Sequence, residues 1–75
     1  MKTEIETQVE AAISELQPMS GGDTYAVIVL MKQLDAEKIF FAKQLESDSY
    51  RGVQGASARI FSLCEAITEL RHIYM

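Results

Sequence analysis

Apolar residues near the N-terminus recur at the spacing of one helical face. They lie three or four residues apart, with mostly polar residues between them: Ile5, Val9, Ala12 and Leu16. This spacing is typical of an amphipathic helix. Thr3 and Glu6 have the residue types and the spacing of a capping box, and Pro18 stops a helix because it has no backbone N–H. The pattern therefore predicts a helix over residues 4–17.

A longer helix is predicted over residues 24–46, after a linker at residues 18–22 that contains Pro, Ser and Gly. Either Asp23 or Thr24 has the chemistry to cap its N-terminus. The apolar run at residues 25–31 is rich in β-branched side chains, which also suit a buried strand. We favour a helix, because the pattern continues without a breaker and no second strand candidate exists with which this one could pair.

The helix predicted over residues 24–46 is apolar on two sides. Its main stripe consists of Val27, Leu30, Met31, Leu34, Phe41 and Leu45. A second stripe, about 140° around the helix, consists of Tyr25, Val29, Ala36 and Phe40. A helix with two apolar sides normally packs between two partners.

A third helix is predicted over residues 50–73, and Ser47, Asp48 and Ser49 supply residues for its cap. Its apolar residues alternate three and four apart, as in a coiled-coil seam: Val53, Ala56, Ile60, Leu63, Ile67, Leu70 and Tyr74. The connection to the preceding helix is too short for anything but an antiparallel hairpin. The sequence thus predicts one all-α domain over residues 1–75, with a short N-terminal helix packed on a long antiparallel helical hairpin.

Composition and charge exclude several classes of protein. Hydrophobic residues make up 48% of the 75-residue chain, which is too many for a disordered protein. The net charge of −4 argues against nucleic acid as a partner. The longest apolar run is only seven residues, and the first residues lack the apolar core of a signal peptide. We therefore expect a soluble cytoplasmic protein that does not bind membranes.

Catalytic and metal-binding chemistry has little support in the sequence. The chain has one cysteine, Cys64, and one histidine, His72. Cys64 lies beside the apolar stripe and suits a small buried residue, and His72 suits the negative end of a helix dipole. No spacing brings a base to a nucleophile. We predict a protein that is not an enzyme, with no catalytic residues, cofactor or metal.

The second stripe is the strongest functional signal. Together with Phe61 on the third helix it gives the candidate interface residues Tyr25, Val29, Ala36, Phe40 and Phe61. We expect the N-terminal helix to cover part of this surface and the rest to be an interface, either with an unidentified protein or between copies of the chain, most simply in a two-fold dimer. The alternative is a monomer in which the N-terminal helix covers all of it.

Tyr50 and Arg51, followed by Gly52, suggest a different function. An aromatic ring and a guanidinium at a helix N-terminus can bind an anion or a nucleotide. The alternative is an ordinary first turn, in which Arg51 is solvated or paired with Asp48.

The stretch from Leu45 to Gly55, with Tyr50 and Arg51 after an acidic cap, runs on into a helix with Ile60 and Leu63. This region resembles the helical hairpin of small bacteriophage-encoded proteins of unknown activity. The resemblance implies an accessory or inhibitor protein that acts in the host cytoplasm by binding a larger host or virion protein. It implies no catalytic residues.

Overall fold

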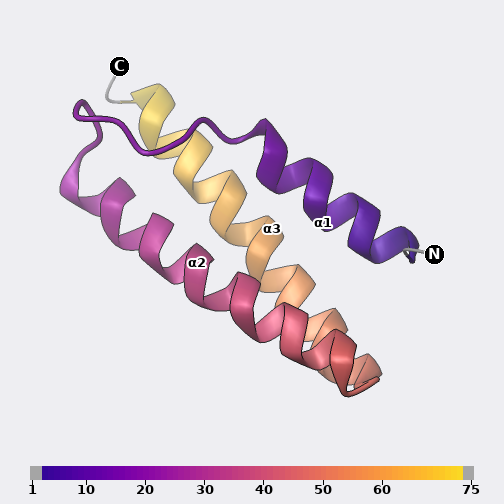
Figure 1. The fold of residues 1–75 in the computed structure, drawn as a ribbon. Coiled ribbons are helices and arrows are strands. Elements are labelled where there is room, and N and C mark those ends of the chain that lie inside the picture. Colours follow the sequence, from indigo (N-terminus) through magenta and orange to yellow (C-terminus); the bar gives the residue numbers. More distant parts are fainter. Residues whose placement is uncertain (1–2, 74–75) are drawn as a thin grey trace.

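The computed structural model describes residues 3–73 and is all-α (Figure 1). Its three helices are α1 (Glu4–Glu15), α2 (Tyr25–Glu46) and α3 (Tyr50–Ile73). The described residues contain no strand, so the prediction of a helix rather than a strand at the start of α2 is confirmed. Helix α1 ends two residues earlier than predicted and α2 begins one residue later, because the capping residues themselves are not helical.

The ends of α1 follow from local side-chain chemistry. The Thr3 hydroxyl accepts a hydrogen bond from the Glu6 backbone N–H at 3.2 Å, and the Glu6 carboxylate accepts one from the Thr3 backbone N–H at 3.2 Å. This reciprocal pair is the predicted capping box. At the other end, Leu16 already has an extended backbone, two residues before Pro18.

The turn between α2 and α3 reverses the chain through a left-handed residue. Asp48 has φ 56°, the only positive φ among the non-glycine residues described. The Ser49 N–H donates to the Gln44 carbonyl at 3.1 Å and the Asp48 N–H donates to the Leu45 carbonyl at 3.3 Å. These two bonds form a Schellman motif that ends α2. The Ser49 hydroxyl then accepts from the Gly52 N–H at 3.2 Å and so caps α3.

Two contacts across the hairpin fix its register. The Arg59 Nε donates to the Glu37 carboxylate at 2.6 Å. Nearer the turn, the Gln44 side chain occupies the space where a Cβ on Gly52 would lie. Residues 37 and 59 are equally distant from Asp48 along the chain, and so are residues 44 and 52. The two helices are therefore antiparallel and symmetric about the turn, as predicted (Figure 1).

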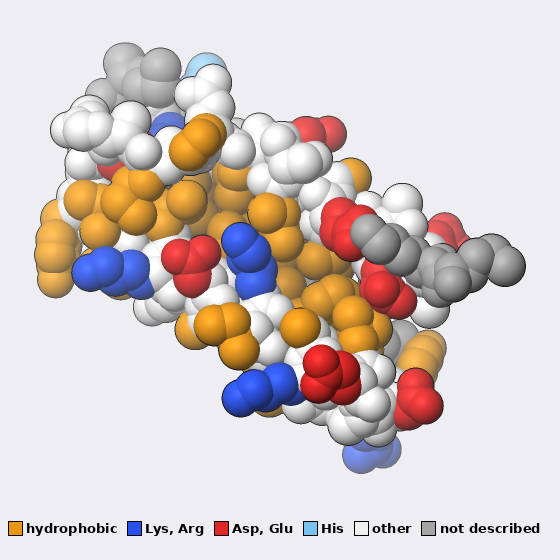
Figure 2. Space-filling view, in the orientation of Figure 1, with side chains coloured by type: hydrophobic (Ala, Val, Ile, Leu, Met, Phe, Trp, Pro, Cys, Tyr) orange, Lys and Arg blue, Asp and Glu red, His pale blue; other side chains and the backbone are white. Residues whose placement is uncertain are grey.

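Helix α3 lies in the middle of the molecule. Helix α2 packs along it, and α1 packs on α3 without its backbone approaching that of α2 (Figure 1). The side chains that fill the space between α1 and α2 are largely hydrophobic (Figure 2). The N-terminal helix therefore does not cover the second stripe of α2. The expectation that it covers part of the candidate interface is wrong for the interface residues that lie on α2. The physical reason is that α3 offers α1 a more continuous apolar stripe.

The core contains residues from all three helices. Its centre on α3 is fully buried at Ala56, Ile60 and Ile67. Leu63 is only partly buried, and Tyr74, the last residue of the predicted apolar stripe, lies outside the described residues. The buried hydrophobic residues are Val9, Val27, Leu34, Phe41, Val53, Ala56, Ile60, Cys64 and Ile67.

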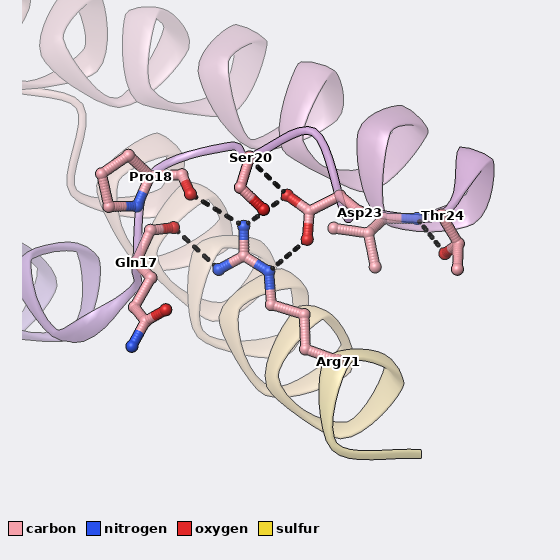
Figure 3. Close-up of polar contacts among 7 residues, drawn as sticks. Gln17, Pro18, Ser20, Asp23, Thr24 and Arg71 are labelled. Atoms are coloured by element: carbon pink, nitrogen blue, oxygen red, sulfur yellow. Dashed lines mark hydrogen bonds and ion pairs between the residues drawn. The ribbon is translucent and has the colours of Figure 1, made fainter. Parts of the chain in front are cut away.

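A partly buried arginine, Arg71, ties the linker to the end of α3 (Figure 3). The Arg71 guanidinium donates to both carboxylate oxygens of Asp23, at 3.0 and 2.9 Å. It also donates to the backbone carbonyls of Gln17 at 2.7 Å and Pro18 at 3.3 Å. The Ser20 N–H donates to Asp23 at 3.0 Å. The side chains of Arg71 and Asp23 are only 14% and 7% exposed, so this cluster, the linker anchor, is shielded from water.

The linker anchor gives Asp23 a role different from the expected one. Thr24, and not Asp23, caps α2 by accepting from the Val27 N–H at 3.4 Å. The hydrogen bond from Arg71 lowers the pKa of the Asp23 carboxyl below its ordinary value of 3.8, and the bond from the Ser20 N–H lowers it further. Asp23 is thus held ionised where the linker crosses the end of α3.

Asp23→Asn tests the linker anchor, since it removes the charge at constant size. The folded pKa of Asp23 lies below 3.8, so its stabilising effect is fully present above that pH and is lost as the pH falls through the folded pKa. We expect the variant to melt several degrees below the parent at neutral pH, and the difference to close as the solution becomes more acidic than the ordinary carboxyl pKa. Thermal unfolding followed by circular dichroism across this pH range measures both effects.

Asp35→Asn is the matched control for that experiment. The Asp35 carboxylate lies 3.7 Å from the Lys38 ammonium on an exposed helix surface, where ion pairs contribute little. We expect its melting temperature to stay close to that of the parent at every pH. Equal melting curves for the Asp23 and Asp35 variants would show that the anchor does not hold the linker in solution.

Leu34→Ala tests the hairpin core. Leu34 is almost completely buried, and truncation of such a residue destabilises by about 2–5 kcal/mol. Leu63→Ala should cost less, because Leu63 is only partly buried. Ile73→Ala, at the exposed end of α3, should stay within about 0.5 kcal/mol of the parent. Urea unfolding gives the four free energies, and an effect of Ile73→Ala as large as that of Leu34→Ala would contradict the placement of Leu34 in the core.

Candidate interaction face

The second stripe of α2 is an uncovered surface in the structure. The Tyr25 side chain is 81% exposed and that of Phe40 is 39% exposed. Ala36 is also exposed, whereas Val29 is partly buried. Ile39, which belongs to neither predicted stripe, lies beside this surface and is 61% exposed. Its exposure could not be found by periodicity, because a single apolar residue between two stripes carries no repeating pattern.

A shallow groove runs between α2 and α3 beside this stripe. Its volume is about 510 Å³, and three small side chains line it: Ala36 from α2, and Ala58 and Ser62 from α3. The remaining lining residues are Gln33, Glu37, Arg59 and Leu63. No residue of α1 contributes to the groove, which lies on the side of the hairpin away from α1. Small residues in a groove let another side chain or helix approach closely.

Arg59 holds Phe40 at the edge of the groove. The guanidinium carbon of Arg59 lies 5.4 Å from the centre of the Phe40 ring, within the range of a cation–π contact. The Nε of the same guanidinium also donates to the Glu37 carboxylate. An exposed ion pair of this kind adds little stability by itself, but here it orients an exposed aromatic ring. The sequence signal for it is the equal distance of residues 37 and 59 from the hairpin turn.

Phe61 lies apart from the other four candidate interface residues. It is two positions beyond Arg59 on α3, which places it about 160° around the helix. Arg59 contacts Phe40, so Phe61 points to the opposite side of the hairpin. Its side chain is 36% exposed. The structure therefore brings together Tyr25, Val29, Ala36 and Phe40, but not Phe61.

Tyr50 and Arg51 do not come together in one site. Tyr50 lines a pocket of about 540 Å³ between the hairpin turn and the start of α1, and its hydroxyl accepts a hydrogen bond from Gln54 at 2.8 Å. Arg51 does not line this pocket, although the carboxylates of Glu4 and Asp48 do. The described residues that line it include no lysine, arginine or histidine. The charge of these lining residues is therefore unfavourable for binding the anion or nucleotide that the sequence suggested at Tyr50 and Arg51.

Cys64 and His72, the single cysteine and histidine of the chain, are not part of the second stripe. Cys64 is buried beside α1, and burial raises the pKa of its thiol while the positive charge of Lys38 opposes that shift. A thiol of this kind is a weak nucleophile. His72 is exposed in the last turn of α3. Within residues 3–73, no three His, Cys, Asp or Glu side chains are grouped as metal ligands, and no helix has the length and hydropathy to cross a membrane.

The chain matches no protein-family model, no curated protein and no solved structure with which it was compared. Its own fold and surface are therefore the basis for a functional hypothesis. Among the described surfaces, the second stripe with its adjoining groove combines exposed aromatic area, small residues and an oriented side chain.

Proposed function

We propose that this protein is a non-catalytic protein-interaction module whose binding surface is the second stripe of α2 and the groove beside it. The observation that carries the proposal is Phe40, an exposed aromatic ring that the Arg59 guanidinium contacts. Aromatic residues are enriched at the centres of interfaces because they bury a large area with few rotatable bonds. A ring that is already oriented loses less conformational entropy when a partner covers it.

The surroundings of Phe40 support the same function. Tyr25 and Ile39 add exposed apolar surface on α2, and Ala36 leaves room beside the ring. Neighbouring polar groups supply a rim, since Gln33 lines the groove and Arg59 and Glu37 form an ion pair there. An apolar centre with a polar rim is the usual composition of a protein–protein interface.

We extend the proposal to an accessory or inhibitor role, in which the module acts on a larger host or virion protein. The support for this extension is the resemblance of residues 45–67 to small bacteriophage proteins.

Photocrosslinking tests whether the second stripe contacts a protein. A photoreactive amino acid replaces Ala36 in the cell that makes the protein, and a second sample carries it at Ala11, an exposed position on α1. We expect a protein adduct at position 36 that is lost when Phe40→Ser is added, because the ring supplies most of the buried contact. No adduct at position 36, or an adduct that survives Phe40→Ser, would contradict the proposal. The Ala11 sample controls for contacts elsewhere on the protein.

A further inference from the structure

We propose that a second copy of this chain occupies the second stripe, in an antiparallel two-fold dimer in which α2 packs against α2. The inference rests on the proposed function, because it names a second copy as the partner of that same surface; a larger host or virion protein would then bind another face of the dimer. The two-fold axis crosses α2 midway between Ala36 and Phe40. Each Phe40 then enters the groove of the other copy beside Ala36.

The exposed area of the chain is larger than the average for a compact monomer of its mass. Its accessible surface is 5403 Å², whereas a folded monomer of 8.4 kDa is expected to expose about 4,600 Å². The excess is roughly 800 Å², the area that one partner typically buries in a stable two-protein interface. The molecule is elongated, 39 × 18 × 16 Å, and α1 packs on α3 and leaves the outer side of α2 uncovered.

The shape of the surface is complementary to itself. Phe40 is exposed and contacts Arg59, which lines the groove, and Ala36, one helical turn away on the same helix, forms part of the groove. When two such helices lie antiparallel about an axis midway between these residues, each Phe40 lies opposite the Ala36 of the other copy. The same contact is therefore made twice, as a two-fold interface requires. The small side chains of Ala58 and Ser62 leave room for the incoming ring.

The charges also permit two copies to meet on this side. Four of the eleven acidic residues lie on α1, which has no lysine or arginine, whereas residues 16–73 hold seven acidic and six basic residues. The hairpin is therefore nearly neutral, and the acidic helix lies on the other side of α3. In the proposed register Lys43 lies at the level of the other copy's Gln33, and Lys32 at the level of its Gln44. Lys38 lies at the level of the axis, but it is about 160° around α2 from both Ala36 and Phe40 and so points away from the other copy.

Light scattering coupled to size exclusion tests the dimer on the full chain. We expect a mass of twice 8.4 kDa at tens of micromolar protein. Ala36→Glu should raise the dissociation constant at least about tenfold, because it places an unpaired charge and extra bulk where Phe40 inserts. Ala42→Glu is the matched control, an identical change at another exposed alanine of α2, and should leave the dimer unchanged. Far-UV circular dichroism verifies that both variants remain folded.

Chemical crosslinking is a second test, and it does not require a substitution that weakens the interface. In Ala36→Cys a short bis-maleimide should link two copies near the axis, whereas Ala42→Cys should give no such product, and the native Cys64 is buried. A parent of 8.4 kDa at hundreds of micromolar, or equal effects of the two glutamate variants, would overturn the dimer. A monomeric parent would still leave the second stripe as a binding surface. That wider proposal fails when position 36 crosslinks to no protein, or when its adduct survives Phe40→Ser.

Discussion

Helix α3 is the single surface on which both other helices pack, and the shape of the molecule depends on it. Its central residues Ile60 and Ile67 are fully buried because α1 and α2 approach that stripe from two sides. Helix α1 has 12 residues and α3 has 24, so α1 is about 18 Å long and covers only half of a helix of about 36 Å. A short helix that packs on α3 leaves the outer side of α2 without a cover.

The linker anchor determines where α1 ends and α2 begins relative to that surface. A linker with two glycines has many conformations in the unfolded chain, and ordering it has an entropic cost. Arg71 offsets part of this cost by binding a carboxylate and two backbone carbonyls at once. The bidentate geometry of the guanidinium also makes the contact specific, because few other positions of the linker would satisfy all its donors. The anchor therefore connects the packing of α1 to the last turn of α3.

The uncovered side of α2 is organised and not simply exposed. Single apolar residues are common on protein surfaces and need no explanation. Phe40 differs because Arg59 lies over its ring and Glu37 fixes Arg59, so three side chains from two helices share one arrangement. This arrangement depends on the register of the hairpin, which the Schellman turn at Asp48 sets. The turn thus sets the register of the hairpin, and the register places Arg59 next to Phe40 at the proposed interface.

The sequence by itself determined the three helices, the capping box of Thr3 and Glu6, the antiparallel hairpin and the apolar second stripe. These features depend on residues within a few positions of one another, and so their spacing encodes them. Only the tertiary structure decided that α1 packs on α3 alone, that Asp23 binds Arg71 and that Phe61 is separate from Phe40. Asp23 and Arg71, for example, are 48 residues apart, and which distant residues meet depends on how each helix is rotated about its axis. The spacing of apolar residues identifies the apolar side of a helix. When that side is wide enough for two neighbouring helices, the spacing does not determine which helix packs on it.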